Sequence, residues 1–291
     1  GCPDWPGCYG ILSTPDTEQE LLRAKELYPD STIDIGKAWR EMFHRYLAGT
    51  LGILVFLITY LTLKYAKHVP KIYPISLSIL IVVQSTMGML TVTQLVKPTI
   101  VTTHLILGMT TAGLLLWNGL QVQIKDKINS IDFRLVNLIF ICTLALIFQI
   151  ILGGWTSTNY AAFSCTDFPL CQGKVFPNMN FLGGFNFFQD IGPNYLGGQM
   201  DLESRTAIHF THRIGALVVS LFLSFLAWKI YKDNYKRISL ILMGLLLVQI
   251  LLGVSNIIFQ LPLLIAVAHN LGGLSLITYL MVLRFRYQHD N

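Results

Sequence analysis

The sequence predicts an all-α polytopic membrane protein made of two pseudo-symmetric four-helix bundles, the first lacking one helix. Three observations lead to this prediction. The 291 residues are 53% hydrophobic and 13% charged, whereas soluble proteins carry about 25% charged residues. Several apolar segments are long enough to cross a bilayer. The two halves of the chain also repeat the same motifs in the same order.

Seven apolar segments match the ~20 residues that a helix rising about 1.5 Å per residue needs to cross a bilayer. The spans are residues 42–63, 72–95, 100–122, 134–154, 206–228, 238–259 and 262–283.

Lys and Arg are concentrated in one set of loops. Loops 64–71, 124–134 and 229–237 and the C-terminal tail hold twelve basic and four acidic residues, a net charge of +8. The rest of the chain has a net charge of −3. Because cytoplasmic loops carry excess Lys and Arg, we expect loops 1–40 and 155–205 on the outer, periplasmic side. The chain is then a multi-pass inner-membrane protein, or a mitochondrial inner-membrane protein if eukaryotic.

Four of the five cysteines lie in these outer loops, in the segments CPDWPGC and CTDFPLC. A C-x5-C pair on a side that permits disulfides predicts a Cys2–Cys8 bridge and a Cys165–Cys171 bridge. Free thiols, or a metal site with too few ligands, are the alternatives. Cys142 stands alone within a span, where a cysteine acts as a small buried hydrophobe.

The halves repeat in parallel, since corresponding spans cross the membrane in the same direction. Each half should form a four-helix bundle, a common setting for a cofactor. We divide the chain into residues 1–123 and 124–291, and expect the span that would complete the first bundle to lie upstream of Gly1. The repeat aligns His44-Arg45 with His212-Arg213, Gln84 and Gly88 with Gln249 and Gly253, and His104 with His269.

Four histidines lie at matched depth near the outer ends of the spans: His44, His104, His212 and His269. Ionisable residues within a bilayer are rare and usually functional. Two imidazoles from facing helices can hold a heme iron between them. Zinc fits less well because it needs three or four protein ligands, and each half repeats two. A core histidine remains the alternative for each residue alone.

The halves differ at one position near these histidines. Glu41 precedes His44 by one helical turn, whereas the residue before His212 in the same register is His209. A carboxyl group in one half indicates that chemistry occurs at the first site only. The alternative is an acid favoured by the helix macrodipole. Arg45 and Arg213 suit heme propionates through bidentate geometry, or serve as interface anchors.

These motifs resemble the heme A synthase family. The resemblance rests on CPDWPGC, E-x-x-H-R at residues 41–45, His104, H-x-x-H-R at residues 209–213 and His269, and it covers essentially the whole chain. Members of that family have eight spans in two four-helix halves. The resemblance implies that the C8 methyl of heme O is oxidised through an alcohol to the aldehyde of heme A, for terminal oxidases.

The resemblance also implies roles for individual residues. His212 and His269 would ligate a resident heme b, His44 and His104 would ligate the substrate heme, and Glu41 would be catalytic. The Cys2–Cys8 pair would matter for activity. Expected partners are heme O, a heme O synthase, an electron acceptor and the lipid bilayer, with no nucleic acid.

Two other functions share these features. A quinol-linked diheme cytochrome uses the same histidine pairs but gives no reason for Glu41 in one half only. A heme transporter would bind heme without changing it. Broad apolar faces are consistent with a homo-oligomer and equally with lipid alone.

Overall fold

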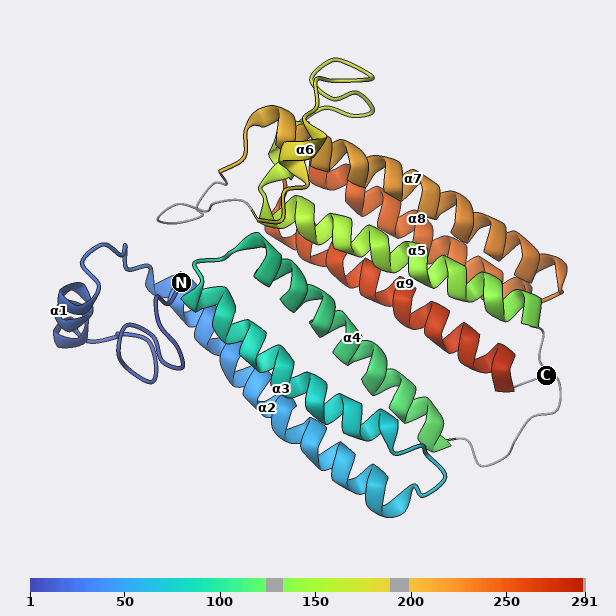
Figure 1. Ribbon diagram of the computed structural model, residues 1–291, viewed down its shortest axis with the longest axis horizontal. Helices are drawn as coiled ribbons and strands as arrows, with labels where there is room; N and C mark the ends of the chain where they lie inside the picture. The colour runs from blue at the N-terminus through green and yellow to red at the C-terminus, as the bar shows by residue number, and fades with distance from the viewer. Residues whose placement is uncertain (124–132, 189–198, 290–291) are drawn as a thin grey trace. The chain divides into compact units, whose positions relative to one another are not determined.

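The computed structural model describes residues 1–123, 133–188 and 199–289 (Figure 1). Over these ranges seven helices are long and apolar enough to cross a membrane. Each coincides with a predicted span, which confirms the all-α polytopic fold. The seven are α2 (Ile35–Tyr65), α3 (Ile72–Thr93), α4 (Pro98–Gln123), α5 (Phe133–Thr158), α7 (Leu202–Lys232), α8 (Lys236–Ile258) and α9 (Leu263–His289).

The chain forms two compact units, residues Gly1–Leu114 and Leu115–Asn291. This division falls within α4, and the predicted division after residue 123 stays a prediction. Part of the charge pattern behind the predicted sidedness lies outside the described residues, as does part of the 155–205 loop. These residues are Lys125, Asp126, Lys127, Asp132, Asp290 and 189–198.

Helices α2 and α7 begin before the apolar segments that predicted them. Asp34 caps α2 by accepting a hydrogen bond from the Lys37 amide at 2.9 Å, and Asp201 caps α7 through the Ser204 amide at 2.7 Å. Such caps satisfy amides that have no partner within the helix. Glu41 therefore lies in the second turn of α2. Because the macrodipole effect fades beyond the first turn, it accounts poorly for this acid.

The second unit holds a four-helix bundle, in which α5 and α8 each pack against both α7 and α9 (Figure 1). Its core is aliphatic and takes side chains from every helix, including Ile139, Leu223, Leu242 and Leu280. These residues lie toward the basic ends of the helices. His212 and His269 lie nearer the cysteine-loop end, so the bundle separates an apolar core from a polar site.

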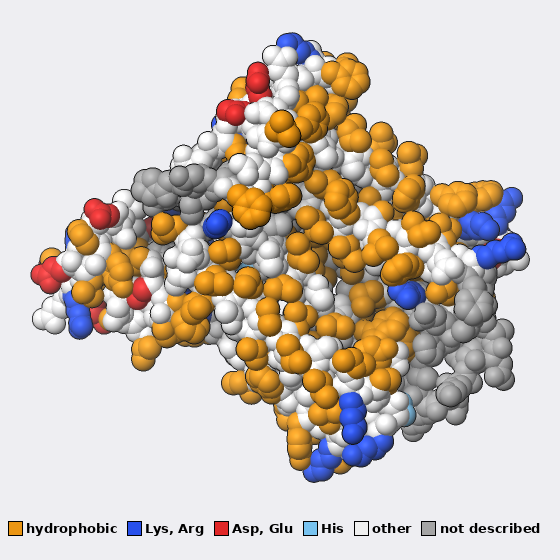
Figure 2. All heavy atoms as spheres, in the orientation of Figure 1, with side chains coloured by type: hydrophobic (Ala, Val, Ile, Leu, Met, Phe, Trp, Pro, Cys, Tyr) orange, Lys and Arg blue, Asp and Glu red, His pale blue; other side chains and the backbone are white. Residues whose placement is uncertain are grey.

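In the first unit α2 packs against α3, and Val55 on α2 and Leu77 on α3 are both buried. Their remaining faces are apolar yet exposed: only 11% of the residues in the most hydrophobic window of each helix are buried. Hydrophobic side chains cover the helical faces seen in Figure 2. Such faces suit lipid, as expected of a membrane protein.

The cysteine loops contain short helices that hydrophobicity alone does not predict. Helix α1 (Glu18–Leu27) begins with a capping box, in which Thr17 and Glu20 satisfy each other's backbone amides. The second loop contains a 3-10 turn at Ala161–Ser164 and the single-turn helix α6 (Phe181–Gly184). The TEQE segment carried the sequence signal for α1.

Candidate functional site

The two cysteine loops form the same small structure. Cys2 is joined to Cys8 and Cys165 to Cys171, with Cα–Cα distances of 4.8 and 4.7 Å. All four cysteines are buried. Reduction of either bridge therefore requires its loop to open.

An aspartate inside each loop binds the backbone that follows it. Asp4 accepts hydrogen bonds from the Tyr9 and Gly10 amides at 2.6 and 2.8 Å. Asp167 accepts from Gln172 and Gly173 at 2.7 and 2.9 Å. The amide of Gly173, with that of Gln172, holds the pKa of the Asp167 carboxyl below its usual range because both bonds favour the carboxylate.

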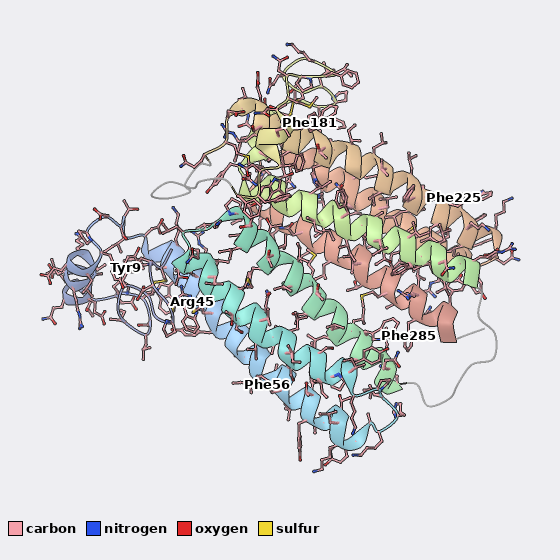
Figure 3. The ribbon with its side chains drawn as sticks, in the orientation of Figure 1. Tyr9, Arg45, Phe56, Phe181, Phe225 and Phe285 are labelled. Carbon is pink, nitrogen blue, oxygen red and sulfur yellow. A yellow bond between two sulfur atoms is a disulfide. The ribbon has the colours of Figure 1, made fainter. Side chains whose placement is uncertain are left out.

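The two arginines hold these loops on the membrane helices. Arg213 on α7 donates to the carbonyl oxygens of Leu170, Cys165 and Asp167 at 2.8, 3.0 and 3.0 Å. Arg45 on α2 likewise donates to backbone carbonyls of the first loop (Figure 3). Its acceptors are the carbonyl oxygens of Asp4, Pro6 and Gly7. Both guanidinium groups therefore donate to backbone carbonyls. The pairing of Arg45 and Arg213 with heme propionates stays a prediction.

Glu41 lies where the first loop meets α2. One carboxylate oxygen accepts the Cys2 amide at 2.8 Å, and the other pairs with Arg45. In the second unit the matching residue, His209, is buried, and its Nε2 lies 3.3 Å from Nε of Arg213. The structure therefore connects Glu41 to the Cys2–Cys8 loop as well as to the helix of His44.

His212 lies on α7 and His269 on α9, and both helices pack against α5 and α8 in the second bundle. The Gln149 amide nitrogen is 3.0 Å from Nδ1 of His212, and the Gln249 amide nitrogen is 3.5 Å from Nε2 of His269. Nδ1 of His269 is buried and has no hydrogen-bond partner in the described part of the chain. This ring nitrogen is available to a ligand.

The first unit arranges its histidines in a related way. His104 on α4 receives a hydrogen bond at its backbone carbonyl from Gln84 on α3, at 3.0 Å. Its Nδ1 is also buried without a partner among the described residues. His44 on α2 is exposed in the structure. Each unit therefore contains one of the two predicted histidine pairs.

This chain matches one protein family model and several individual proteins. The family model for cytochrome oxidase assembly proteins (COX15-CtaA) matches residues 1–281. The chain is 41% identical over its whole length to a heme A synthase of Shewanella oneidensis, covering 89% of that protein. The chain belongs to the heme A synthase family. It is also 25% identical to a heme A synthase of Wolbachia pipientis, over 92% of this chain and 83% of that protein.

The heme A synthase family implies involvement of heme, and the residues of the second unit fit that group. Two histidines face one bundle interior, one with a buried unpartnered ring nitrogen. Glycines, rather than larger residues, lie against both rings: a Cβ added to Gly153 or Gly253 would lie 3.0 or 3.1 Å from an imidazole Cε1. Sequence reasoning aligned Gln249 and Gly253 within the repeat but did not connect Gln149 or Gly153 with a histidine.

Proposed function

We propose that this chain oxidises the C8 methyl of heme O, through the alcohol, to the formyl group of heme A. The observation that carries this proposal is the asymmetry between two otherwise matched histidine sites. Glu41 stands where the second unit has His209, and it is held by two donors one turn from His44. Membership of the heme A synthase family supports the same reaction.

In this proposal the second unit holds the resident cofactor. His212 and His269 ligate heme b, which when bound supplies a one-electron carrier. Neutral imidazoles within an apolar bundle suit this task. The aliphatic core beside them excludes water from one end of the site.

The first unit holds the substrate heme between His44 and His104. Glu41 stabilises positive charge that develops at the methyl carbon, or takes the proton that leaves it. The Cys2 amide and Arg45 fix the carboxylate before the substrate binds. Such preorganisation avoids a reorganisation cost during reaction.

The same proposal places the cysteine loops on the periplasmic side of an inner membrane. The disulfides and the concentration of Lys and Arg in the opposite loops support this orientation. A heme O synthase would supply the substrate. With water as the source of the oxygen atom, the methyl-to-alcohol step and the alcohol-to-aldehyde step would each release two electrons and two protons, and the electrons would pass through the resident heme to an electron acceptor. A homo-oligomer is one way to cover the apolar faces.

Conversion of heme O to heme A by the purified protein tests the reaction. Glu41→Gln preserves side-chain size but removes the charge, and it should lower heme A formation by about 10²–10³-fold. Glu203→Gln, which neutralises an exposed acid in the first turn of α7, should leave formation unchanged. Heme b at His212 and His269 should be retained in both variants.

Each other result has a definite meaning. Wild-type heme A output from Glu41→Gln would remove this residue from the reaction. A wild-type protein that binds both hemes but makes no heme A would favour a diheme cytochrome or a heme transporter.

A further inference from the structure

We propose that Gln149 and Gln249 are positioning residues for the heme b site, whose amide oxygens accept the N–H of the iron-bound imidazoles. This inference rests on the proposed function, because it takes His212 and His269 as the ligands. It adds residues that contact the histidines and not the heme iron. Neither the histidine motif nor the family match gives these residues a role.

The structure repeats one arrangement, here called the glutamine clasp, on three pairs of helices. One helix carries a glutamine and, four residues later, a glycine. Its partner carries the histidine and, three or four residues later, another glycine. The clasps are Gln84, Gly88, His104 and Gly108 on α3 and α4, Gln149, Gly153, His212 and Gly215 on α5 and α7, and Gln249, Gly253, His269 and Gly272 on α8 and α9.

The first glycine of each clasp seats the imidazole. A Cβ at Gly88, Gly153 or Gly253 would lie 3.2, 3.0 or 3.1 Å from Cε1 of the facing histidine. Real Cβ atoms rarely come so close, so each ring edge rests on bare helix backbone. The ring is thereby fixed in depth and in direction by its neighbouring helix.

The second glycine holds the amide. A Cβ at Gly215 would overlap Oε1 of Gln149, and one at Gly272 would overlap Oε1 of Gln249. Each amide therefore lies in a slot on the histidine's own helix. Nε2 of Gln149 also donates to the His212 carbonyl at 2.9 Å, which fixes the amide beside the ring it contacts.

The amide oxygens of the clasps lack donors. Oε1 of Gln84, Gln149 and Gln249 is buried and has no hydrogen-bond partner among the described residues. A buried oxygen without a donor is destabilising, and an amide oxygen of this kind occurs in all three clasps.

A liganded imidazole supplies the missing donor. A ring that binds iron through one nitrogen carries a proton on the other, and that N–H usually bonds a carbonyl or carboxylate. An amide presents its nitrogen or its oxygen within nearly the same outline. Gln149 can thus donate to Nδ1 of a free ring, as observed. Once the ring is bound, the amide would turn over, give up its bond to the His212 carbonyl and accept from the ring N–H.

Heme titration, redox potentiometry and electron paramagnetic resonance of the full chain test this role. Gln149→Leu and Gln249→Leu should each weaken heme b binding by about 10–100-fold and raise the reduction potential, because the ligand becomes less basic. Gln149→Glu and Gln249→Glu should restore binding and lower the potential. The control Gln260→Leu changes an exposed residue that follows α8 and should alter neither quantity.

The outcomes separate this inference from the proposed function. If the Leu and Glu variants all keep the wild-type potential and resonance spectrum, the glutamines only pack helices, and the inference is wrong even where heme affinity falls. If His212→Ala keeps heme b, the ligand assignment itself fails. Loss of heme from the histidine variants, together with opposite potential shifts in the Leu and Glu variants, supports both.

Discussion

The sequence is consistent with two roles for Arg213, as an anchor for the cysteine loop or as a partner of a heme propionate. Replacing Arg213 by leucine distinguishes the two roles. In Arg213→Leu the carbonyls of Leu170, Cys165 and Asp167 lose their donors. We expect the second cysteine loop to detach from α7 more often. Heme b affinity should be unchanged if the guanidinium serves the loop alone.

The size of the effect follows from those three bonds. A hydrogen bond from a charged donor contributes about 1.5–3 kcal/mol net, but bonds from one side chain are not additive. Arg213 is also partly exposed, so we take about 3 kcal/mol for the set. At about 1.4 kcal/mol per tenfold change, the open population should rise by roughly 100-fold.

Reduction of the buried Cys165–Cys171 bridge reports that opening. Thiol reduction followed by alkylation and peptide mass analysis should show this bridge reacting about 100-fold faster, if opening is rapid relative to reduction. The Cys2–Cys8 bridge is held by Arg45 in the other unit, so it provides an internal control. An unchanged rate at Cys165–Cys171 combined with loss of heme b would refute the anchor role and establish the propionate role.

Two further predictions concern the same unit. His212→Ala or His269→Ala should abolish the low-spin bis-imidazole spectrum of heme b, and an unchanged spectrum in either variant would show that its ligand is wrongly assigned. The depressed pKa of Asp167 means that its carboxylate stabilises the loop above a pH of about 4 and loses this effect as pH falls through the folded-state pKa. Reduction of Cys165–Cys171 by a phosphine should therefore accelerate at low pH, whereas Asp167→Asn should react fast and show less pH dependence.

The membrane helices could be predicted because hydrophobic length is a direct consequence of bilayer thickness. The starts of α2 and α7 could not be read the same way. Asp34 and Asp201 extend both helices beyond the apolar segments, and such caps depend on local backbone geometry. Glu41 therefore lies deeper in its helix than the span boundary indicates.

The surroundings of the candidate site were harder to predict than its histidines. Arg45 and Arg213 bind backbone carbonyls. Because every residue has a backbone carbonyl, the sequence does not indicate which carbonyls accept these bonds. The loop aspartates could have been found in the sequence, because the pattern C-x-D-x-P-x-C-x-G occurs in both loops with Asp4 and Asp167 at the same position. The clasp of Gln149 was missed because the repeat alignment compared whole halves, and the α5 span has no counterpart in the first unit.

That clasp shows a repeat within the second unit itself. Within the second unit, α5 with α7 and α8 with α9 carry the same four residues: Gln149 matches Gln249, and Gly153, His212 and Gly215 match Gly253, His269 and Gly272. The repeated structural unit is therefore smaller than a four-helix half: it is a pair of helices in which one histidine ring lies against a glycine of the neighbouring helix. In the proposed function each pair of helices would supply one of the two heme ligands, so the second bundle would hold its cofactor between two copies of one helix pair.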